Sequence, residues 1–218
     1  MRENIKNISY VGFDIDNTLY PPNKRIDEII QKEIAEKILE KKPELKNLEK
    51  ALEFSEQRYS ETGSRSILLR EAGYTIPGEI LHNCLLNHGI IPLIKKDNKL
   101  KKIIEKLYIK YNLFLITNNP EDLALKKLDK IGIDPELFKL KYYGDISPAI
   151  KKADGSLFKF FLEDSKYKPD QILYVGDSRK ADIIPARILG MKTIAVGREI
   201  PEADFSVKKI YGIKDILL

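Results

Sequence analysis

The sequence predicts an α/β fold: a Rossmann-like parallel sheet with helices on both faces, and a helical segment inserted after the first strand. Two observations carry this prediction. Beyond about residue 94, short apolar runs alternate with stretches of helical periodicity, which is the pattern of a parallel sheet covered on both sides. Residues 26–90 show helical periodicity alone. We therefore expect a core of residues 1–20 and 94–218 and a helical domain of residues 21–93.

The first predicted strand is the apolar run from Tyr10 to Phe13. It leads directly into a polar stretch that contains Asp14, Asp16 and Thr18. A short apolar run of this kind is typical of a buried strand. The carboxylates are therefore expected at the carboxyl end of the first strand.

The inserted segment begins with isoleucines that recur every fourth residue from Ile26 to Ile38, so that they form one apolar helix face. Pro43 and Gly63 are expected to start and end a second helix. Tyr59 continues the apolar stripe of that helix, and we expect it in the core. Two shorter helices are expected over residues 64–72 and 77–88.

Beyond the insertion the chain is expected to return to alternating strands and helices. The Asn119-Pro120 pair is expected to cap the helix that ends at Gly132. The expected strands are residues 113–116, 140–143, 172–175 and 192–196, and the other expected helices are residues 97–108, 154–163 and 181–189.

Length and composition limit the class of protein. The 218 residues suit one domain with an insertion, and 43% hydrophobic residues exclude a wholly disordered chain. No apolar run approaches the roughly 18 residues that cross a bilayer, and residues 1–7 do not resemble a signal peptide, so a cytoplasmic protein is expected. The single cysteine, Cys84, excludes an internal disulfide and a cysteine-ligated zinc site.

The chain carries a net charge of +5, from 38 Lys and Arg against 33 Asp and Glu. The lysines alternate with acidic residues and form no basic stripe, so nucleic-acid binding is not expected. The oligomeric state is left open by the sequence.

Polar residues follow several of the predicted strands, and Lys151 and Lys152 lie before the helix expected over residues 154–163. Ligands bind at the carboxyl ends of the strands in an open parallel sheet. The polar residues offer carboxylate, hydroxyl, amide and ammonium groups at one sheet edge. These residues are Asp14, Asp16, Thr18, Thr117, Asn118, Asn119, Lys151, Lys152, Asp177, Ser178 and Asp182.

This set of groups suits phosphoryl transfer. A phosphate dianion repels an attacking carboxylate, and Mg²⁺ held by oxygen ligands removes much of that repulsion. Hydroxyl, amide and ammonium donors stabilise the charge that shifts onto the phosphate oxygens. An aspartate can act as the nucleophile, and a second carboxyl two residues further along can protonate the leaving alcohol.

Four segments resemble, in order, the four motifs of the haloacid dehalogenase-like (HAD) hydrolase superfamily. The stretch from Phe13 to Leu19 resembles the first motif, and Thr117-Asn118-Asn119 resembles the second. Lys152 to Phe158 resembles the third, although Ala153 stands where the family usually has proline, so Lys151 remains an alternative for its lysine. Gly176-Asp177 with Asp182 resembles the fourth.

The resemblance implies an Mg²⁺-dependent phosphatase that acts on a small phosphomonoester, a nucleotide or a sugar phosphate. It also implies a C1-type helical cap for residues 21–93. The stretch from Asp14 to Pro21 is also similar to pyrimidine 5′-nucleotidase-like members of the superfamily.

The resemblance also assigns roles to individual residues. It implies that Asp14 is the nucleophile and that Asp16 is the general acid and base. It implies that Thr117 and Asn118 hold the phosphate. The remaining implied roles are neutralisation of Asp14 and the phosphate by Lys152, and binding of the metal by Asp14, Asp16 (through its backbone carbonyl), Asp177 and, directly or through water, Asp182.

The same motifs could belong to proteins other than a phosphatase. A calcium loop of the EF-hand type is excluded because Leu19 and Arg25 stand where it needs glycine and glutamate. A dehalogenase has no leaving alcohol to protonate, so Asp16 argues against it. A phosphomutase and a non-catalytic phospholigand-binding protein remain as alternatives.

Four residues of the insertion are candidates for substrate contact. We expect each of them to be packed or solvent-facing rather than bound to substrate. They are Arg65, Arg70, His82 and His88.

Overall fold

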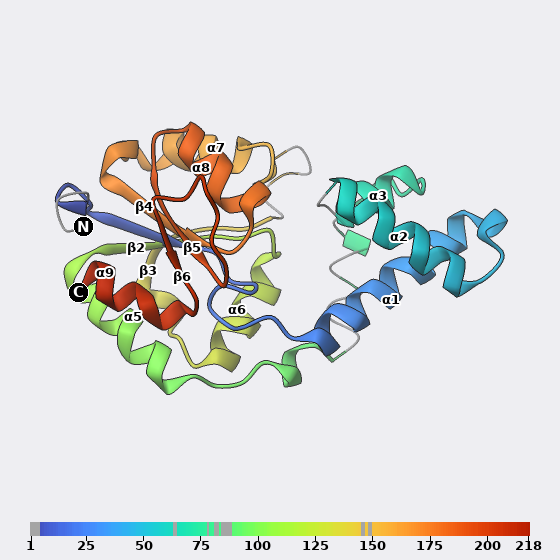
Figure 1. Ribbon diagram of the computed structural model, residues 1–218, viewed down its shortest axis with the longest axis horizontal. Coiled ribbons are helices and arrows are strands. Elements are labelled where there is room, and N and C mark those ends of the chain that lie inside the picture. Colours follow the sequence, from blue (N-terminus) through green and yellow to red (C-terminus); the bar gives the residue numbers. More distant parts are fainter. Residues whose placement is uncertain are drawn as a thin grey trace. The chain divides into compact units, whose positions relative to one another are not determined.

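The computed structural model describes residues 5–62, 65–77, 79–80, 83, 89–144, 147 and 150–218 (Figure 1). The chain separates into two compact units. The first consists of Met1–Pro22 and Ile94–Leu218, and the second of Asn23–Leu93. The second unit begins two residues later than the helical domain expected from the sequence, and its role as a cap stays a prediction.

The first unit is built on one parallel sheet of six strands in the order β3-β2-β1-β4-β5-β6. The predicted fold class, a Rossmann-like parallel sheet with helices on both faces, is confirmed. The strand order changes direction between β1 and β4, and ligands of open α/β sheets bind at such a switch point. The strands are β1 (Tyr10–Phe13), β2 (Asn112–Ile116), β3 (Phe138–Tyr142), β4 (Ile172–Gly176), β5 (Lys192–Val196) and β6 (Phe205–Val207).

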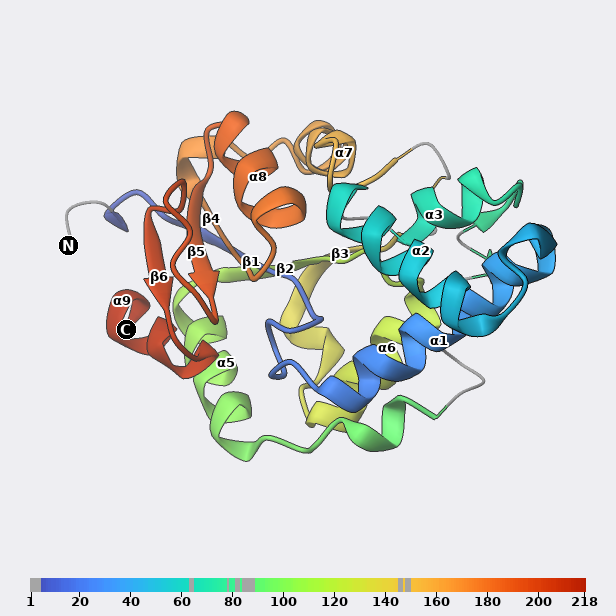
Figure 2. The ribbon, with the colours of Figure 1, turned by 45° about the vertical axis from the view of Figure 1, so that its right-hand side comes forward.

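Helices cover the two faces of this sheet (Figures 1 and 2). One face carries α7 (Ser156–Ser165) and α8 (Ile184–Ile188), and the other carries α5 (Asn98–Lys110), α6 (Glu121–Ile131) and α9 (Ile213–Leu217). Because both faces are covered, the central strands are almost continuously apolar and buried. The shorter elements are the 3₁₀ turns η4 (Pro135–Leu137), η5 (Pro169–Gln171) and η7 (Ile210–Gly212) and the π-helical turn η6 (Arg179–Ile183).

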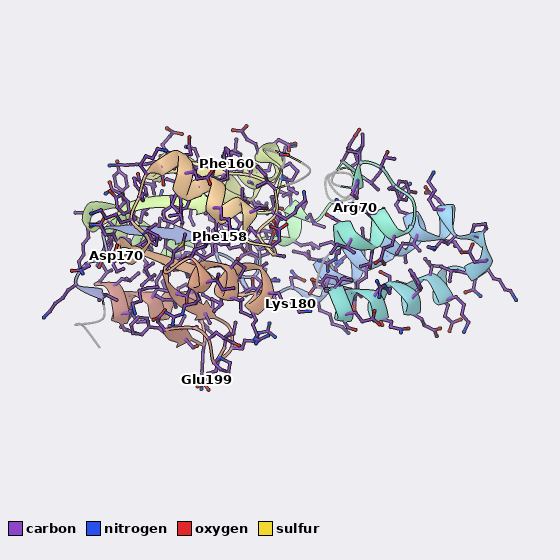
Figure 3. All side chains as sticks on the ribbon, turned by 90° about the horizontal axis from the view of Figure 1, so that it is seen from above. Arg70, Phe158, Phe160, Asp170, Lys180 and Glu199 are labelled. Atoms are coloured by element: carbon purple, nitrogen blue, oxygen red, sulfur yellow. The ribbon has the colours of Figure 1, made fainter. Side chains whose placement is uncertain are left out.

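Aromatic side chains fill the space between the sheet and α7. Phe114 stacks on Phe161 with ring centroids 4.4 Å apart, and Phe158 meets Tyr174 edge to face at 4.8 Å. Figure 3 shows Phe158 inside this unit, with Phe160 of the same helix nearer its outer side. Gly12 pairs with both Phe114 and Tyr174 in the sheet, and a Cβ at residue 12 would lie 2.2 Å from the Phe114 ring. Glycine is therefore required there for the two rings to meet across β1.

Most of the predicted elements of this unit are present within one to three residues of their expected ends. Asp97 caps α5 by accepting hydrogen bonds from the N–H groups of Lys99 and Leu100, and Gly132 ends α6 in the left-handed conformation. The helix expected over residues 181–189 is instead the π-helical turn η6 followed by α8. Neither β6 nor α9 was predicted from the sequence.

The second unit is helical in the residues that the structure describes. It contains α1 (Lys24–Lys41), α2 (Leu48–Thr62) and α3 (Arg65–Glu71), with the 3₁₀ turns η2 (Pro43–Leu45) and η3 (Ile91–Leu93). Its core contains Ile34, Ile38, Leu68, Leu69 and Ala72. The Arg58 guanidinium joins α2 to α3 through two hydrogen bonds to the Glu71 carboxylate.

Two expectations for this unit are wrong. Pro43 heads the short turn η2, and α2 begins only at Leu48. Tyr59 is 37% exposed, because α2 buries its Ala51 and Ser55 face instead. The Arg65 guanidinium lies 4.6 Å from the centre of the Tyr59 ring, so that the two side chains form a cation–π pair on the surface.

Of the other residues singled out in this unit, only Arg70 lies among the described residues. Arg70 is exposed on α3 (Figure 3), as expected. The helix expected over residues 77–88 falls largely outside the described residues, and so do His82, Cys84 and His88. Among the helices in the described part of the chain, none is long and apolar enough to cross a membrane.

Candidate active site

The loops that follow β1, β2 and β4 meet at the switch point of the sheet. The Asp14 N–H donates to the Val175 carbonyl at 3.0 Å, which continues the β1–β4 ladder by one residue. The Thr117 N–H donates to the Tyr142 carbonyl, also at 3.0 Å. These backbone bonds fix the direction in which each loop leaves its strand.

Three predicted carboxylates are brought together in this region. Asp14, Asp177 and Asp182 each offer one carboxylate oxygen, and these oxygens lie within 4.8 Å of one another. Asp14 and Asp182 are buried, and Asp177 is half-buried. Three carboxylates so close in a shielded position repel one another, and a cation would relieve that repulsion.

Lys152 supplies one positive charge to the cluster. Its Nζ lies 2.6 Å from Asp14 Oδ1 and 2.5 Å from Asp182 Oδ1, and the residue is 2% exposed. Of the two lysines considered from the sequence, Lys152 is thus the one whose ammonium meets Asp14. Lys151 is half-buried, and its backbone N–H donates to Ser156 Oγ at 2.7 Å, which anchors the loop at the start of α7.

The pKa values of these groups show that one ammonium does not balance the carboxylates. Burial, together with the charges of Asp182, Asp16 and Asp177, raises the pKa of Asp14 well above its ordinary value despite Lys152. Burial and the Asp182 charge raise the pKa of Asp177 to about 7. Burial alone would lower the pKa of Lys152, but Asp14 and Asp182 raise it well above its ordinary value. The all-oxygen, net-negative donor set therefore fits a hard divalent cation.

Asp182 is held in the π-helical turn η6, a type of turn frequent at functional sites. Its Oδ2 accepts a hydrogen bond from the Ser178 N–H at 2.8 Å, and Ser178 Oγ accepts one from the Ala181 N–H at 3.1 Å. A Cβ at Gly176 would lie 2.4 Å from Asp182 Cγ. Only glycine at residue 176 lets this carboxylate reach Lys152.

We predict that Gly176→Ala destabilises the protein and lowers its activity together. The added methyl group must displace Asp182, which is fixed by both Lys152 and Ser178. Overpacking of this kind costs about 1–3 kcal/mol. Chemical denaturation of the variant measures this loss, and an unchanged unfolding midpoint would show that η6 moves freely.

The loop after β1 brings two further groups to Asp14. Thr18 is buried, and its Oγ1 lies 3.5 Å from Asp14 Oδ2, within reach of a weak hydrogen bond. Asn17 adopts the left-handed conformation with φ of 55°, which asparagine tolerates better than most residues. This conformation turns the chain sharply enough for Thr18 to face back toward Asp14.

The residues of the second motif, in the loop after β2, differ in how deeply they are buried. Thr117 and Asn119 are buried, whereas Asn118 is exposed. Thr117 Oγ1 accepts hydrogen bonds from the Asn119 N–H at 3.2 Å and from Asn119 Nδ2 at 2.8 Å. A Cβ at Gly144 would lie 2.1 Å from the Asn118 carbonyl oxygen, so glycine there lets the neighbouring loop pack against this one.

The Asn119-Pro120 pair stands at the start of α6 as expected, but Pro120 occupies the N-cap and makes no side-chain capping bond. The Asn119 side chain instead donates from Nδ2 to Asp16 Oδ2 at 2.7 Å. Asn119 Oδ1, the atom that would accept from the helix N–H groups, instead accepts a hydrogen bond from Lys127 Nζ at 2.8 Å, and a charged donor makes the stronger bond.

Asp16 stands apart from the three clustered carboxylates and has its own partners. Its Oδ1 accepts hydrogen bonds from Lys127 Nζ at 2.5 Å and from the Tyr20 hydroxyl. Burial alone would raise the pKa of Asp16, but the Lys127 charge and the hydrogen bonds from Lys127, Tyr20 and Asn119 lower it. These contacts therefore favour the ionised form of the Asp16 carboxyl group.

Lys127 and Tyr20 were not predicted from the sequence to belong to the site, and Asn119 was expected to help cap α6. The sequence did contain one indication that Lys127 is buried and paired. Lys127 occupies the apolar face of α6 with Leu123, Ala124, Leu128 and Ile131, and a lysine in such a stripe is almost never buried without a partner.

The sheet, the carboxylates at its switch point and the buried lysine define a hydrolase of a known class. The sequence pattern of the family described as haloacid dehalogenase-like hydrolase matches residues 8–190. The chain belongs to this family, as the four motifs predicted.

Two individual relatives are named as phosphatases. The chain is 24% identical to a glyceraldehyde 3-phosphate phosphatase of Methanocaldococcus jannaschii, over 96% of this chain and 97% of that protein. It is 34% identical to a phosphoglycolate phosphatase of Pseudomonas putida, named as probable, over 38% of this chain and 32% of that protein. The chain thus spans only about a third of the length of this second relative.

The fold is also that of a solved Bacillus subtilis HAD-hydrolase, described as bound to magnesium. The TM-score is 0.64 at 20% identity, over 97% of this chain and 99% of that one.

Proposed function

We propose that the protein is an Mg²⁺-dependent phosphatase that hydrolyses a small phosphomonoester through an aspartyl-phosphate on Asp14. The observation that carries this proposal is the Lys152 ammonium, buried between Asp14 and Asp182, two of the three clustered carboxylates. That arrangement gives a shielded carboxylate nucleophile with a cation beside it. A bound phosphate would find both an attacking oxygen and a positive charge there.

In the first half of the reaction, an Asp14 carboxylate oxygen attacks the phosphorus atom. The phosphorus–oxygen bond to the leaving alcohol breaks, and its electron pair stays on the alcohol oxygen. That oxygen takes a proton from the Asp16 carboxyl group. Thr117 and Asn118 hold the phosphate oxygens, and Lys152 balances the charge on the phosphate.

In the second half, a water molecule attacks the phosphorus atom and gives a proton to Asp16. The bond between phosphorus and Asp14 breaks, which releases inorganic phosphate and restores the Asp14 carboxylate. Asp16 again carries the proton that the next leaving alcohol needs. The lowered pKa of Asp16 favours its ionised form, which is the form that can take this proton.

Mg²⁺ would be held by the carboxylates of Asp14 and Asp177 and the backbone carbonyl of Asp16, with Asp182 in support. When bound, it supplies positive charge that screens the phosphate from the nucleophile. Asp182 Oδ2 accepts a hydrogen bond from the Ser178 N–H, and Oδ1 lies 2.5 Å from Lys152 Nζ in an ion pair but has no hydrogen-bond partner. This suits Asp182 to orient Lys152 or to act through water.

The substrate we propose is a short phosphomonoester. One relative is named as a phosphatase of glyceraldehyde 3-phosphate and the other as a probable phosphatase of phosphoglycolate, and both substrates are small phosphorylated molecules. The helical unit of residues 21–93 would act as a C1-type cap that excludes water and selects the substrate. We place the protein in the cytoplasm, where phosphorylated metabolites are found.

The experiment that tests this function measures inorganic phosphate released in the presence of Mg²⁺. The panel contains phosphoglycolate, glyceraldehyde 3-phosphate, a nucleoside monophosphate and a hexose phosphate. Release from at least one short phosphomonoester is the expected result. Transfer of the phosphoryl group to a second position of the hexose, without release, would instead identify a phosphomutase, and no reaction with any ester would favour a binding protein.

A further inference from the structure

Lys127 is a buried lysine on α6 to which the proposed mechanism gives no role. It is 2% exposed and lies in the apolar stripe that packs α6 against the sheet. A charged amine is almost never buried to this degree without a partner. Its partners lie in the active site, 8 and 111 residues away in sequence.

The contacts of Lys127 form a closed ring with Asn119 and Asp16. Lys127 Nζ donates to Asp16 Oδ1 at 2.5 Å and to Asn119 Oδ1 at 2.8 Å. Asn119 Nδ2 donates to Asp16 Oδ2 at 2.7 Å. An ammonium can only donate, so Lys127 obliges Asn119 to turn its oxygen toward α6 and its amino group toward Asp16.

We infer that Lys127 is a positioning residue that, with Asn119, fixes the Asp16 carboxyl group in the orientation in which it exchanges a proton with the leaving oxygen. This inference rests on the proposed function, in which Asp16 gives its proton to the leaving oxygen and regains one from water. Each Asp16 oxygen then has a donor from the ring, Lys127 on Oδ1 and Asn119 on Oδ2. Rotation of the carboxyl group would break both bonds at once.

The ring also ties Asp16 to the second motif. Asn119 Nδ2 donates to Thr117 Oγ1 at 2.8 Å as well as to Asp16. The Asn119 amide thus fixes both the Asp16 carboxyl group, which exchanges the proton, and the loop that we propose holds the phosphate. Proton transfer needs heavy atoms about 2.6–3.2 Å apart, and a misplacement of about 1 Å can cost about 10²-fold in rate.

The test compares two esters that differ in their need for a proton. Phenol has a pKa of about 10, as the tyrosine side chain does, so phenyl phosphate needs protonation as its bond breaks. Dinitrophenyl phosphate has a far better leaving group and does not. We expect Lys127→Met to slow the first turnover of phenyl phosphate by about 10²-fold, to slow that of dinitrophenyl phosphate less than threefold, and to leave KM for both within about threefold.

A double-mutant cycle separates positioning from general damage to the fold. If Lys127 acts through Asp16, Lys127→Met has no further effect on phenyl phosphate turnover in an Asp16→Asn background. Equal slowing of both esters, or an additive loss in that background, would overturn the inference. Lys126→Met is the matched control, since Lys126 is the preceding residue of α6 and its ammonium lies on the surface near Asp122. It should leave both rates unchanged.

A second variant keeps the test decisive if Lys127→Met does not fold. Asn119→Ala removes the other side of the ring and leaves the Lys127–Asp16 ion pair in place. We expect it also to slow phenyl phosphate selectively, and a loss shared equally by both esters would contradict the ring. Failure of the proposed function has its own signature, because Asp16→Asn would then not discriminate between the two esters. Selectivity in Asp16→Asn without selectivity in the Lys127 or Asn119 variant overturns only the present inference.

Discussion

Asp14→Asn is expected to abolish turnover while leaving the protein folded. The carboxamide has nearly the shape of the carboxylate but is a poor nucleophile, so the aspartyl-phosphate would not form. The expected loss in kcat is at least about 10³-fold, the scale for removal of an essential covalent catalyst. Lys152 keeps Asp182 as a partner at 2.5 Å in this variant, so its charge is not left alone.

The measurement for Asp14→Asn is steady-state phosphate release together with a far-UV circular dichroism melt. Asp122→Asn is the matched control. It makes the same change from carboxylate to carboxamide, but at an exposed aspartate that pairs with Lys126. That control should keep full activity. If Asp14→Asn kept a tenth of the wild-type rate, Asp14 would not be the nucleophile.

Removal of divalent metal is expected to stop the reaction, and Mg²⁺ is expected to restore it. Without a cation, burial and the neighbouring carboxylates raise the pKa values of Asp14 and Asp177, which disfavours the ionised nucleophile. Ca²⁺ should inhibit, because it takes about 6–8 ligands and would draw the Asp14 oxygen away from phosphorus. The assay compares activity after exhaustive chelation with activity after each metal is returned.

Thermal stability gives a second measure of the metal site that is independent of activity. A ligand that binds only the folded state stabilises it by about 2.7 kcal/mol at 100 times its Kd. We therefore expect Mg²⁺ to raise the Tm of the wild type and to raise that of Asp177→Asn much less. Full activity after chelation, or an equal Tm shift in both proteins, would refute a metal site at this cluster.

The sequence by itself predicted the sheet and most of the clustered groups. Short apolar strands that alternate with amphipathic helices leave few arrangements other than a parallel sheet. The carboxyl ends of such strands meet at one edge. Asp14 follows the first predicted strand directly, and Asp177 follows the strand predicted over residues 172–175 after one glycine. Their approach therefore depended only on β1 and β4 being neighbours.

Features that depend on side-chain packing were predicted less well. Tyr59 was expected in the core but lies on the surface, since α2 turns its small residues Ala51 and Ser55 inward. The edge strand β6 was missed because it has only three residues and carries little periodicity. The lysine of the third motif was ambiguous in sequence, because Lys151 and Lys152 are neighbours of the same type.

What the sequence determined about this protein is the set of motifs, their order along the chain and the sheet edge at which they meet. These follow from local hydrophobic pattern and from the topology of parallel sheets. Only the tertiary structure decided which donors surround Asp16. Lys127 reaches it from 111 residues away, and Asn119 turns to it instead of capping α6. Such contacts depend on how a helix is rotated against the sheet and on which acceptor is nearest, and local pattern does not encode either.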